Sequence, residues 1–347
     1  MRQLENINLD TLISIIKGKK VACFGAGLQG KRVAEFFSNW EVANHLIAYI
    51  DNSDSKIGKK LNSGEGTYPI YSLKQAVEVL PSDLLILISC MDYKTIYEQL
   101  EKEVKKDWIC IAINEVAEVE FFQTKEMQVI KETENPVIPK KIHYVWIGGE
   151  MPLILKKNVE MWKQLCPDYE FYEWNDNNYN IKSVPYMKQA YELKKWAFVS
   201  DYIRLDVVYK YGGIYLDTDI EMVKKPDTLL YQHCFGCVDS SLTMNLGSGF
   251  GAVPGMEIIR ELRDYYNGIS FLKEDGSMDF TSCNTYSYQV LKKYGYKINN
   301  KLQTVKGMNI YPMIFQGACQ FANKKLINDK TFFIHYGNLS WFKNRTK

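Results

Sequence analysis

Residues 211–219 read Tyr-Gly-Gly-Ile-Tyr-Leu-Asp-Thr-Asp and hold the sole D-x-D triplet of the sequence. The two glycines are typical of a helix C-terminus, and the alternating side chains after them predict a short strand over Ile214–Asp219. Asp217 and Asp219 then stand at or just past the strand end, where strand geometry can direct both carboxylates to one side. A helix, a strand and two acids therefore meet within nine residues.

Two carboxylates on one side can hold Mg²⁺ or Mn²⁺ and still leave coordination positions for substrate phosphates. A nucleotide-sugar donor needs such an ion, because its leaving diphosphate gains negative charge as the glycosidic bond breaks. For the triplet alone, a solvated pair of turn aspartates is the alternative interpretation.

The apolar spacing of the preceding segment predicts one helix over Met187–Tyr211. It contains Ser-Asp-Tyr-Ile-Arg, in which Asp201 and Arg204 are three residues apart and so share a helix face. Such a pair could orient sugar hydroxyls or a phosphate. An ordinary intrahelical ion pair is the alternative.

A chain of 347 residues favours two domains. The second, 137–347, opens on a strand predicted at Lys141–Ile147. Residues 125–136 are charged, lack strong periodicity and end at a proline, which predicts a linker. The first domain, 1–124, alternates predicted strands with helices, and this alternation predicts a parallel sheet with helices on its faces. Its strands are expected at Lys20–Gly25, Leu46–Ile50, Leu84–Ser89 and Trp108–Ile113.

Gly25, Gly27 and Gly30 fit the pattern G-x-G-x-x-G between a predicted strand and a helix predicted at Lys31–Trp40. In that setting the glycines allow a tight turn and a close approach of the backbone to phosphate. Asp51 follows the second strand, where an acid could hold a ribose hydroxyl. A structural or adaptor role, a nucleotide or nucleotide-sugar, and NAD all remain open for this domain.

The C-terminal motifs resemble glycosyltransferase family 32, which includes fungal mannosyltransferases and bacterial capsule sugar transferases, and they are similar to the catalytic domain of large glucosylating toxins. The resemblance is carried by three segments, namely residues 139–148 (PKKIHYVWIG), residues 197–219 with the D-x-D triplet, and the pairs Ile334-His335 and Ser340-Trp341. It spans residues 137–347 and implies an α/β protein with a GT-A fold in this part of the chain, and transfer with retention at the anomeric carbon.

The resemblance also implies a role for each matched residue. Trp146 would stack on the donor base, with Tyr215 near the base or ribose. The donor sugar would contact Asp201 and Arg204. For the metal site of Asp217, Asp219 and His335, the resemblance implies that Asp219 binds the ion directly. Asp217 would lie close to sugar or ribose hydroxyls or bind the ion through water, and His335 would be a ligand of the metal or of the diphosphate. The remaining donor-binding residues would be Asn245, Ser340 and Trp341. No general base can be named, because in a retaining enzyme the leaving phosphate itself can take the acceptor proton.

The N-terminal segment resembles small Rossmann-like domains that precede bacterial sugar-modifying enzymes, including sugar O-acyltransferases. The resemblance rests on the glycine loop, the short helix and the sequence Ile50-Asp51-Asn52. It implies either nucleotide-sugar binding or an adaptor role.

Composition and charge limit the partners and the compartment that can be expected. The net charge is +2, and without a dense basic stripe the chain is not expected to bind nucleic acid. Eight scattered cysteines and no leader peptide favour the cytoplasm, and no apolar run is long enough to cross a bilayer. Lysine pairs such as 156–157 and 224–225 are usually solvated surface, but they also suit peripheral association with the anionic inner face of a membrane.

The sequence therefore favours a metal-dependent glycosyltransferase that uses Mn²⁺ or Mg²⁺ and a UDP-sugar donor. The acceptor is expected to be a glycan or a lipid-linked acceptor in surface polysaccharide synthesis. Three alternatives remain: a toxin-like protein glycosyltransferase, an NAD-dependent oxidoreductase that uses the glycine loop, and a non-catalytic nucleotide-sugar sensor.

Overall fold

The computed structural model describes residues 1–64, 66–124, 128–318 and 329–336. The chain forms two compact units. Met1–Thr124 and Lys297–Asn299 make up the first, and Lys125–Tyr296 with Asn300–Lys347 the second. The sequence did not predict that 297–299 belong to the first unit, where Trp40 Nε1 donates a hydrogen bond to the Ile298 carbonyl over 2.8 Å. No helix of the described ranges is long and apolar enough to cross a membrane.

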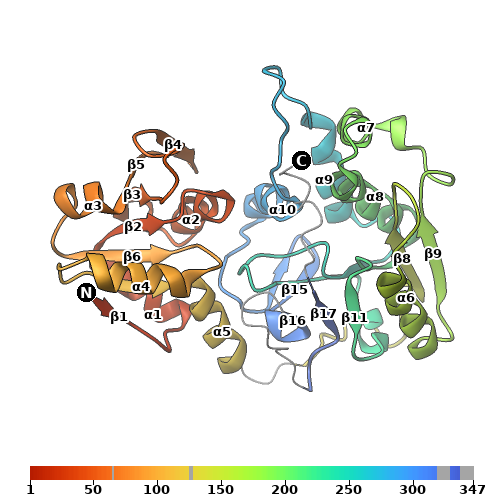
Figure 1. The fold of residues 1–347 in the computed structure, drawn as a ribbon. Coiled ribbons are helices and arrows are strands. Elements are labelled where there is room, and N and C mark those ends of the chain that lie inside the picture. The colour runs from red at the N-terminus through yellow and green to blue at the C-terminus, as the bar shows by residue number, and fades with distance from the viewer. Residues whose placement is uncertain (65, 125–127, 319–328, 337–347) are drawn as a thin grey trace. The chain divides into compact units, whose positions relative to one another are not determined.

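The first unit is built on a seven-stranded sheet of order β1-β7-β6-β2-β3-β5-β4 (Figure 1). Its strands are β1 (Arg2–Gln3), β2 (Lys20–Phe24), β3 (Leu46–Ile50), β4 (Lys60–Ser63), β5 (Gly66–Tyr71), β6 (Leu84–Ile88) and β7 (Ile109–Ala112). Only β4 is antiparallel to its neighbour. Strands β2, β3, β6 and β7 correspond to the four predicted strands, and they pair in parallel as predicted. The short β1, the largely polar β4 and the mostly half-buried β5 lack a run of buried apolar residues and were missed.

Helices α1 (Leu9–Lys17), α2 (Leu28–Asn39), α3 (Leu73–Val79) and α4 (Tyr93–Glu103) each connect two of these strands, and α5 (Ile113–Gln123) follows β7. Helix α3 begins at a capping box, in which the side chains and backbone N–H groups of Ser72 and Gln75 bond to each other. Helices α3 and α4 pack their apolar faces on the buried side chains of β2, β3 and β6. The sheet with these helices forms the core that positions the glycine loop.

The second unit holds two sheets, of orders β14-β15-β12-β13-β10-β8-β9 and β11-β17-β16. Their strands are β8 (Lys141–Val145), β9 (Glu170–Trp174), β10 (Gly213–Tyr215), β11 (Ile220–Met222), β12 (Cys234–Cys237), β13 (Phe250–Ala252), β14 (Gln303–Val305), β15 (Met308–Tyr311), β16 (Gln316–Ala318) and β17 (Phe333–His335). In the larger sheet β9, β8 and β10 run parallel, whereas β13 is antiparallel to β10. This unit is therefore a mixed α/β fold.

Its helices are α6 (Leu153–Leu165), α7 (Pro185–Glu192), α8 (Trp196–Tyr211), α9 (Glu257–Asp264) and α10 (Cys283–Leu291). The prediction of one helix over Met187–Tyr211 was wrong. Lys194 takes a left-handed backbone conformation, with φ of 55°, and this separates α7 from α8. The predicted end at the glycine pair is confirmed, since Gly212 closes α8 with φ of 63°.

One further expectation needs correction. The strand predicted over Ile214–Asp219 ends at Tyr215, because the chain then leaves one sheet for the other, and the two aspartates lie in the connection. The described part of the predicted linker packs on the second unit: Glu132 accepts hydrogen bonds from the His233 N–H and from Asn309 Nδ2. The residue pattern of 125–136 could not predict this packing, because the hydrogen-bond partners of Glu132 lie far away in the sequence.

Candidate active site

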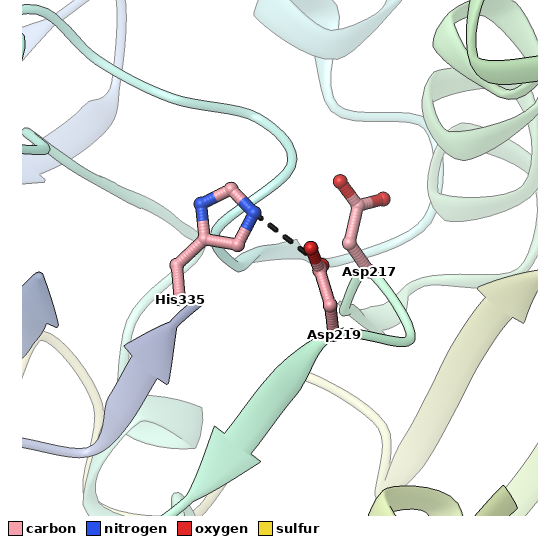
Figure 2. Close-up of side chains that lie close together, drawn as sticks. All are labelled: Asp217, Asp219 and His335. Atoms are coloured by element: carbon pink, nitrogen blue, oxygen red, sulfur yellow. Dashed lines mark ion pairs between the residues drawn. The ribbon is translucent and has the colours of Figure 1, made fainter. Parts of the chain in front are cut away.

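The D-x-D residues lie in the connection that joins β10 to β11, and strand pairing brings His335 to them. Strand β11 pairs with β17 in antiparallel register, with Ile220 opposite His335. Asp219, one residue before β11, therefore meets the end of β17. Figure 2 shows the side chains of Asp217, Asp219 and His335 gathered at this point.

These three residues have a donor set that fits a divalent ion. Each offers one ligand atom, and the three atoms lie within 4.8 Å of one another. His335 Nε2 is 3.4 Å from Asp219 Oδ1. Two carboxylate oxygens and one imidazole nitrogen suit Mn²⁺, and oxygen ligands suit Mg²⁺. Within the described ranges, this is the one group of His, Cys, Asp and Glu side chains gathered closely enough to hold an ion.

His335 is held in place by a second contact. Burial by itself would lower the pKa of His335, but the hydrogen bond with Asp219 and the charges of Asp219, Asp217 and Asp239 together outweigh burial and raise it. On the other side of the ring, Nδ1 lies 3.0 Å from the hydroxyl of the buried Ser248. A hydrogen bond to the far nitrogen of a metal-binding histidine fixes the ring orientation. Ser248 therefore positions Nε2 toward Asp219.

Asp217 has a different environment from Asp219. Its Oδ1 accepts a hydrogen bond from the Tyr215 hydroxyl over 2.7 Å and lies 3.5 Å from Arg204 Nη2. Burial raises the pKa of Asp217, which Arg204 partly opposes. Tyr215 is only 1% exposed, so in this structure it positions Asp217, and its contact with a donor base stays a prediction.

Asp201 and Arg204 form the predicted pair on one face of α8, and both are buried. Arg204 Nη2 lies 3.1 Å from Asp201 Oδ1 and donates to Ser200 Oγ over 3.0 Å. Burial raises the pKa of Asp201 to about 6, against the opposing effect of Arg204. Because Arg204 also approaches Asp217, the pair is part of the D-x-D site as well as an intrahelical contact.

The loop before β13 forms another wall of the site. Asn245 donates from Nδ2 to Asp239 over 2.7 Å and accepts the Gly247 N–H over 2.8 Å, so its role toward a donor stays a prediction. Gly247 lies against Asp217: a Cβ atom at Gly247 would be 2.4 Å from Asp217 Oδ2. The absence of a side chain at Gly247 leaves room for the carboxylate.

Helix α6 holds the middle of the D-x-D connection. Asn158 Nδ2 donates to the Thr218 carbonyl over 3.0 Å, and Trp162 Nε1 donates to the Ile220 carbonyl over the same distance. Trp146 comes directly after β8, the parallel neighbour of β10, and so lies at the same sheet edge as the D-x-D connection. Its indole is partly buried and donates to the Gly149 carbonyl.

Ser340 and Trp341 lie outside the described residues. Sequence reasoning missed Ser248 and Gly247 as individual residues, although both fall in the glycine-containing stretch around Asn245. It missed Asn158 altogether, because nothing in the local sequence distinguishes this asparagine from a surface residue.

The N-terminal glycine loop packs against its own backbone and against Asp51. Gly27 is the N-cap of α2, and a Cβ at Gly30 would be 1.8 Å from the Gly25 carbonyl oxygen, so the loop closes on itself. Asp51 accepts the Ala26 N–H over 2.7 Å and pairs with Lys56 over 2.9 Å. Burial alone would raise the pKa of Asp51, but these hydrogen bonds lower it.

Comparison with known proteins agrees with the chemistry of the second unit. Residues 152–236 match the family model described as "Glycosyltransferase sugar-binding region containing DXD motif". Inositol phosphoceramide mannosyltransferase 2 of Schizosaccharomyces pombe is 35% identical over 101 residues, which cover 28% of this chain and 29% of that protein. Mannosyl phosphorylinositol ceramide synthase of Saccharomyces cerevisiae is 28% identical over 152 residues, 40% of each chain.

A solved structure, "PaToxG Glycosyltransferase", is similar over 59% of this chain and 80% of its own, with 17% identity and a TM-score of 0.37. The matched segment and the named relatives support a glycosyltransferase enzyme. Proteins with this D-x-D region generally use a divalent metal, in agreement with the donor set. The chain matches well under half of the length of these relatives, which leaves substrates and acceptor to be argued from the site.

Proposed function

We propose that this protein transfers a hexose from a nucleotide diphosphate donor to a glycan or lipid-linked acceptor, with retention at the anomeric carbon. The convergence of Asp217, Asp219 and His335, with ligand atoms within 4.8 Å of one another, is the observation that carries the proposal. The two D-x-D carboxylates and that of Asp201 make three acidic groups, and they lie near only one guanidinium and one imidazole. The site therefore has more acidic than basic groups, and a divalent ion would compensate for the difference.

In this proposal Asp217, Asp219 and His335 hold the ion, which supplies electrostatic stabilisation to the leaving diphosphate. Tyr215 and Ser248 orient two of these side chains through the hydrogen bonds described above. Asp201 and Arg204 bind the donor sugar at the edge of the same cluster. No dedicated general base is required, since the leaving phosphate takes the acceptor proton.

The test is release of free nucleotide from a panel of nucleotide-sugars in the presence of Mn²⁺ or Mg²⁺. We expect turnover that depends on the added ion and disappears with chelator. A protein that binds these donors without releasing nucleotide would be a sensor. Release that persists in chelator would remove the ion from the proposal.

We further propose that UDP is the preferred nucleotide, with the Trp146 indole as the stacking surface. The support is the position of Trp146 at the sheet edge that bears Asp217, together with the resemblance of residues 139–148 to enzymes that use UDP-sugars. Calorimetry with Mn²⁺ should show UDP binding more tightly than GDP or ADP, and a loss in Trp146→Ala. Equal binding of GDP would contradict this choice.

For the acceptor we favour a lipid-linked molecule, since two relatives are named for mannosyl transfer to inositol phosphoceramides. Surface polysaccharide synthesis is the setting that we propose, and the cytoplasm the compartment. All seven described cysteines are free, which fits a reducing compartment. Incubation of the active enzyme with lipid-linked and soluble glycans would distinguish the acceptor classes by product mass.

A further inference from the structure

Helix α6 has apolar side chains on two opposite faces. Val159 and Trp162 are buried in the core of the second unit. On the other side Leu153 is 76% exposed, Ile154 68%, and Met161 and Leu165 48% and 37%. Exposed apolar residues that are scattered singly need no explanation, but four along one helix do.

These four residues form one continuous surface. At 3.6 residues per turn, Leu153, Ile154, Met161 and Leu165 fall within an arc of about 120° around the helix axis. The exposed polar residues Lys157 and Gln164 also lie inside this arc. We call the four apolar residues together with Lys157 the α6 outer face. Val159 and Trp162 fall on the opposite side of the helix, so core packing cannot account for the outer face.

The charges of α6 match an anionic surface. The helix carries Lys156, Lys157 and Lys163 against a single acid, Glu160. Lys156 pairs with the highly exposed Glu150 and Lys163 with Glu160, whereas Lys157 is exposed among the apolar side chains. A long lysine side chain can lie along apolar groups while its ammonium reaches a phosphate. Apolar residues interspersed with lysine are typical of helices that lie in a membrane interface.

The outer face borders the proposed catalytic site. Asn158, which lies next to the arc on the helix wheel, donates to the Thr218 carbonyl in the middle of the D-x-D triplet. A surface that docked on α6 would therefore lie next to the metal-binding residues. Among the twelve large hydrophobic residues that are exposed in the described ranges, four are on this helix.

We propose that the α6 outer face docks on an anionic membrane surface and so presents the D-x-D site to acceptors in the lipid layer. The four apolar side chains of this face enter the boundary between the lipid headgroups and the acyl chains. Lys157 pairs with lipid phosphate. The reference to acceptors rests on the proposed function, but membrane binding itself does not.

The test is flotation of the full chain with vesicles of phosphatidylcholine, with and without phosphatidylglycerol. We expect binding to the anionic vesicles and weaker binding to phosphatidylcholine alone. The double variant Leu153→Ser with Ile154→Ser should bind at least about tenfold less. Lys157→Gln should weaken binding to the anionic vesicles, and added salt should do the same.

Phe122→Ser is the matched control, since Phe122 is 67% exposed on the first unit. It should float like the parent protein. Nucleotide release without vesicles should be unchanged in the α6 variants, which also verifies their fold.

Three results would overturn the proposal: a parent protein that does not float, an α6 variant that floats as well as the parent, or a parent dimer that the α6 substitutions dissociate. If flotation fails while nucleotide release persists, only the docking surface is wrong. If flotation succeeds without nucleotide release, the proposed function fails instead.

Discussion

Asp51, which contacts the glycine loop of the first unit, and the D-x-D aspartates of the second unit both follow a buried strand, but their carboxylates have opposite surroundings. Asp51 accepts the Ala26 N–H and pairs with Lys56, and its pKa is lowered. Asp217 and Asp219 instead share a site with a third carboxylate, and burial raises the pKa of Asp217. The protein's own groups compensate the charge of Asp51, whereas an added cation would stabilise the charged carboxylates of Asp217 and Asp219.

The difference indicates where the chemistry lies. An acid that is already bonded to its own loop has less capacity for a ribose hydroxyl, so we expect no hydride transfer from the first unit. Reduction of NAD by a sugar substrate, abolished by Gly27→Val, would restore the oxidoreductase interpretation and remove this contrast.

The largest expected effect follows from Asp219→Asn. Nucleotide release should fall roughly a thousandfold or more, because metal stabilisation of the leaving diphosphate is worth several kcal/mol. The melting temperature without metal, measured at a pH where His335 has lost its proton and no longer forms an ion pair with Asp219, should stay equal or rise, since one charge leaves an acidic cluster. The stabilisation by Mn²⁺ with UDP should vanish.

Asp51→Asn is the matched control for this variant and should leave nucleotide release unchanged. Adding Asp217→Asn to Asp219→Asn should abolish the remaining turnover. The added change also removes a partner of Arg204, which keeps Asp201. A double variant that turns over with metal would contradict the site.

The second effect concerns stability. Arg204→Met leaves Asp201 and Asp217 without their shared guanidinium in a buried place, which should lower the free energy of unfolding by about 3–5 kcal/mol. Lys56→Met removes the partner of Asp51 at a more exposed pair, and the loss should be about 1 kcal/mol or less. Urea unfolding of both variants measures the two losses of unfolding free energy. Equal losses would contradict the contrast between the two sites.

The third effect concerns two glycines, each of which lies so close to a neighbouring atom that an added Cβ would collide with it. A Cβ in Gly247→Ala would displace the Asp217 carboxylate, and a misplaced ligand can lower turnover by about a hundredfold. Gly30→Ala would press on the Gly25 carbonyl instead, so it should destabilise the first unit and leave the turnover of folded protein unchanged. Gly268→Ala, which meets nothing within 4 Å, serves as a neutral substitution.

The smallest effect is expected for Ser248→Ala. Without the hydroxyl, His335 keeps its place on β17 but loses the contact that orients its ring. The concentration of Mn²⁺ needed for half-maximal activity should rise about tenfold, with a lesser change in the maximal rate at saturating ion. An unchanged Mn²⁺ requirement would mean that strand pairing alone orients the imidazole.

The sequence by itself determined the local features of both regions. Four parallel strands of the first unit were predicted from their apolar runs, because a strand buried on both faces needs apolar side chains throughout. The Asp201–Arg204 pair and the helix end at Gly212 followed from spacing of a few residues. These features depend on helix and strand geometry, which short stretches of sequence encode.

Only the tertiary structure decided how the site is assembled. The register of β11 against β17 places His335 beside Asp219, and Ser248 reaches that ring from 87 residues away. Asn158 holds the D-x-D connection from another helix, and the enclosed Tyr215 contacts Asp217. Family resemblance named His335 but not its partners. Such contacts depend on how whole elements pack, and neither local propensity nor residue spacing encodes the register between strands that are far apart in the chain.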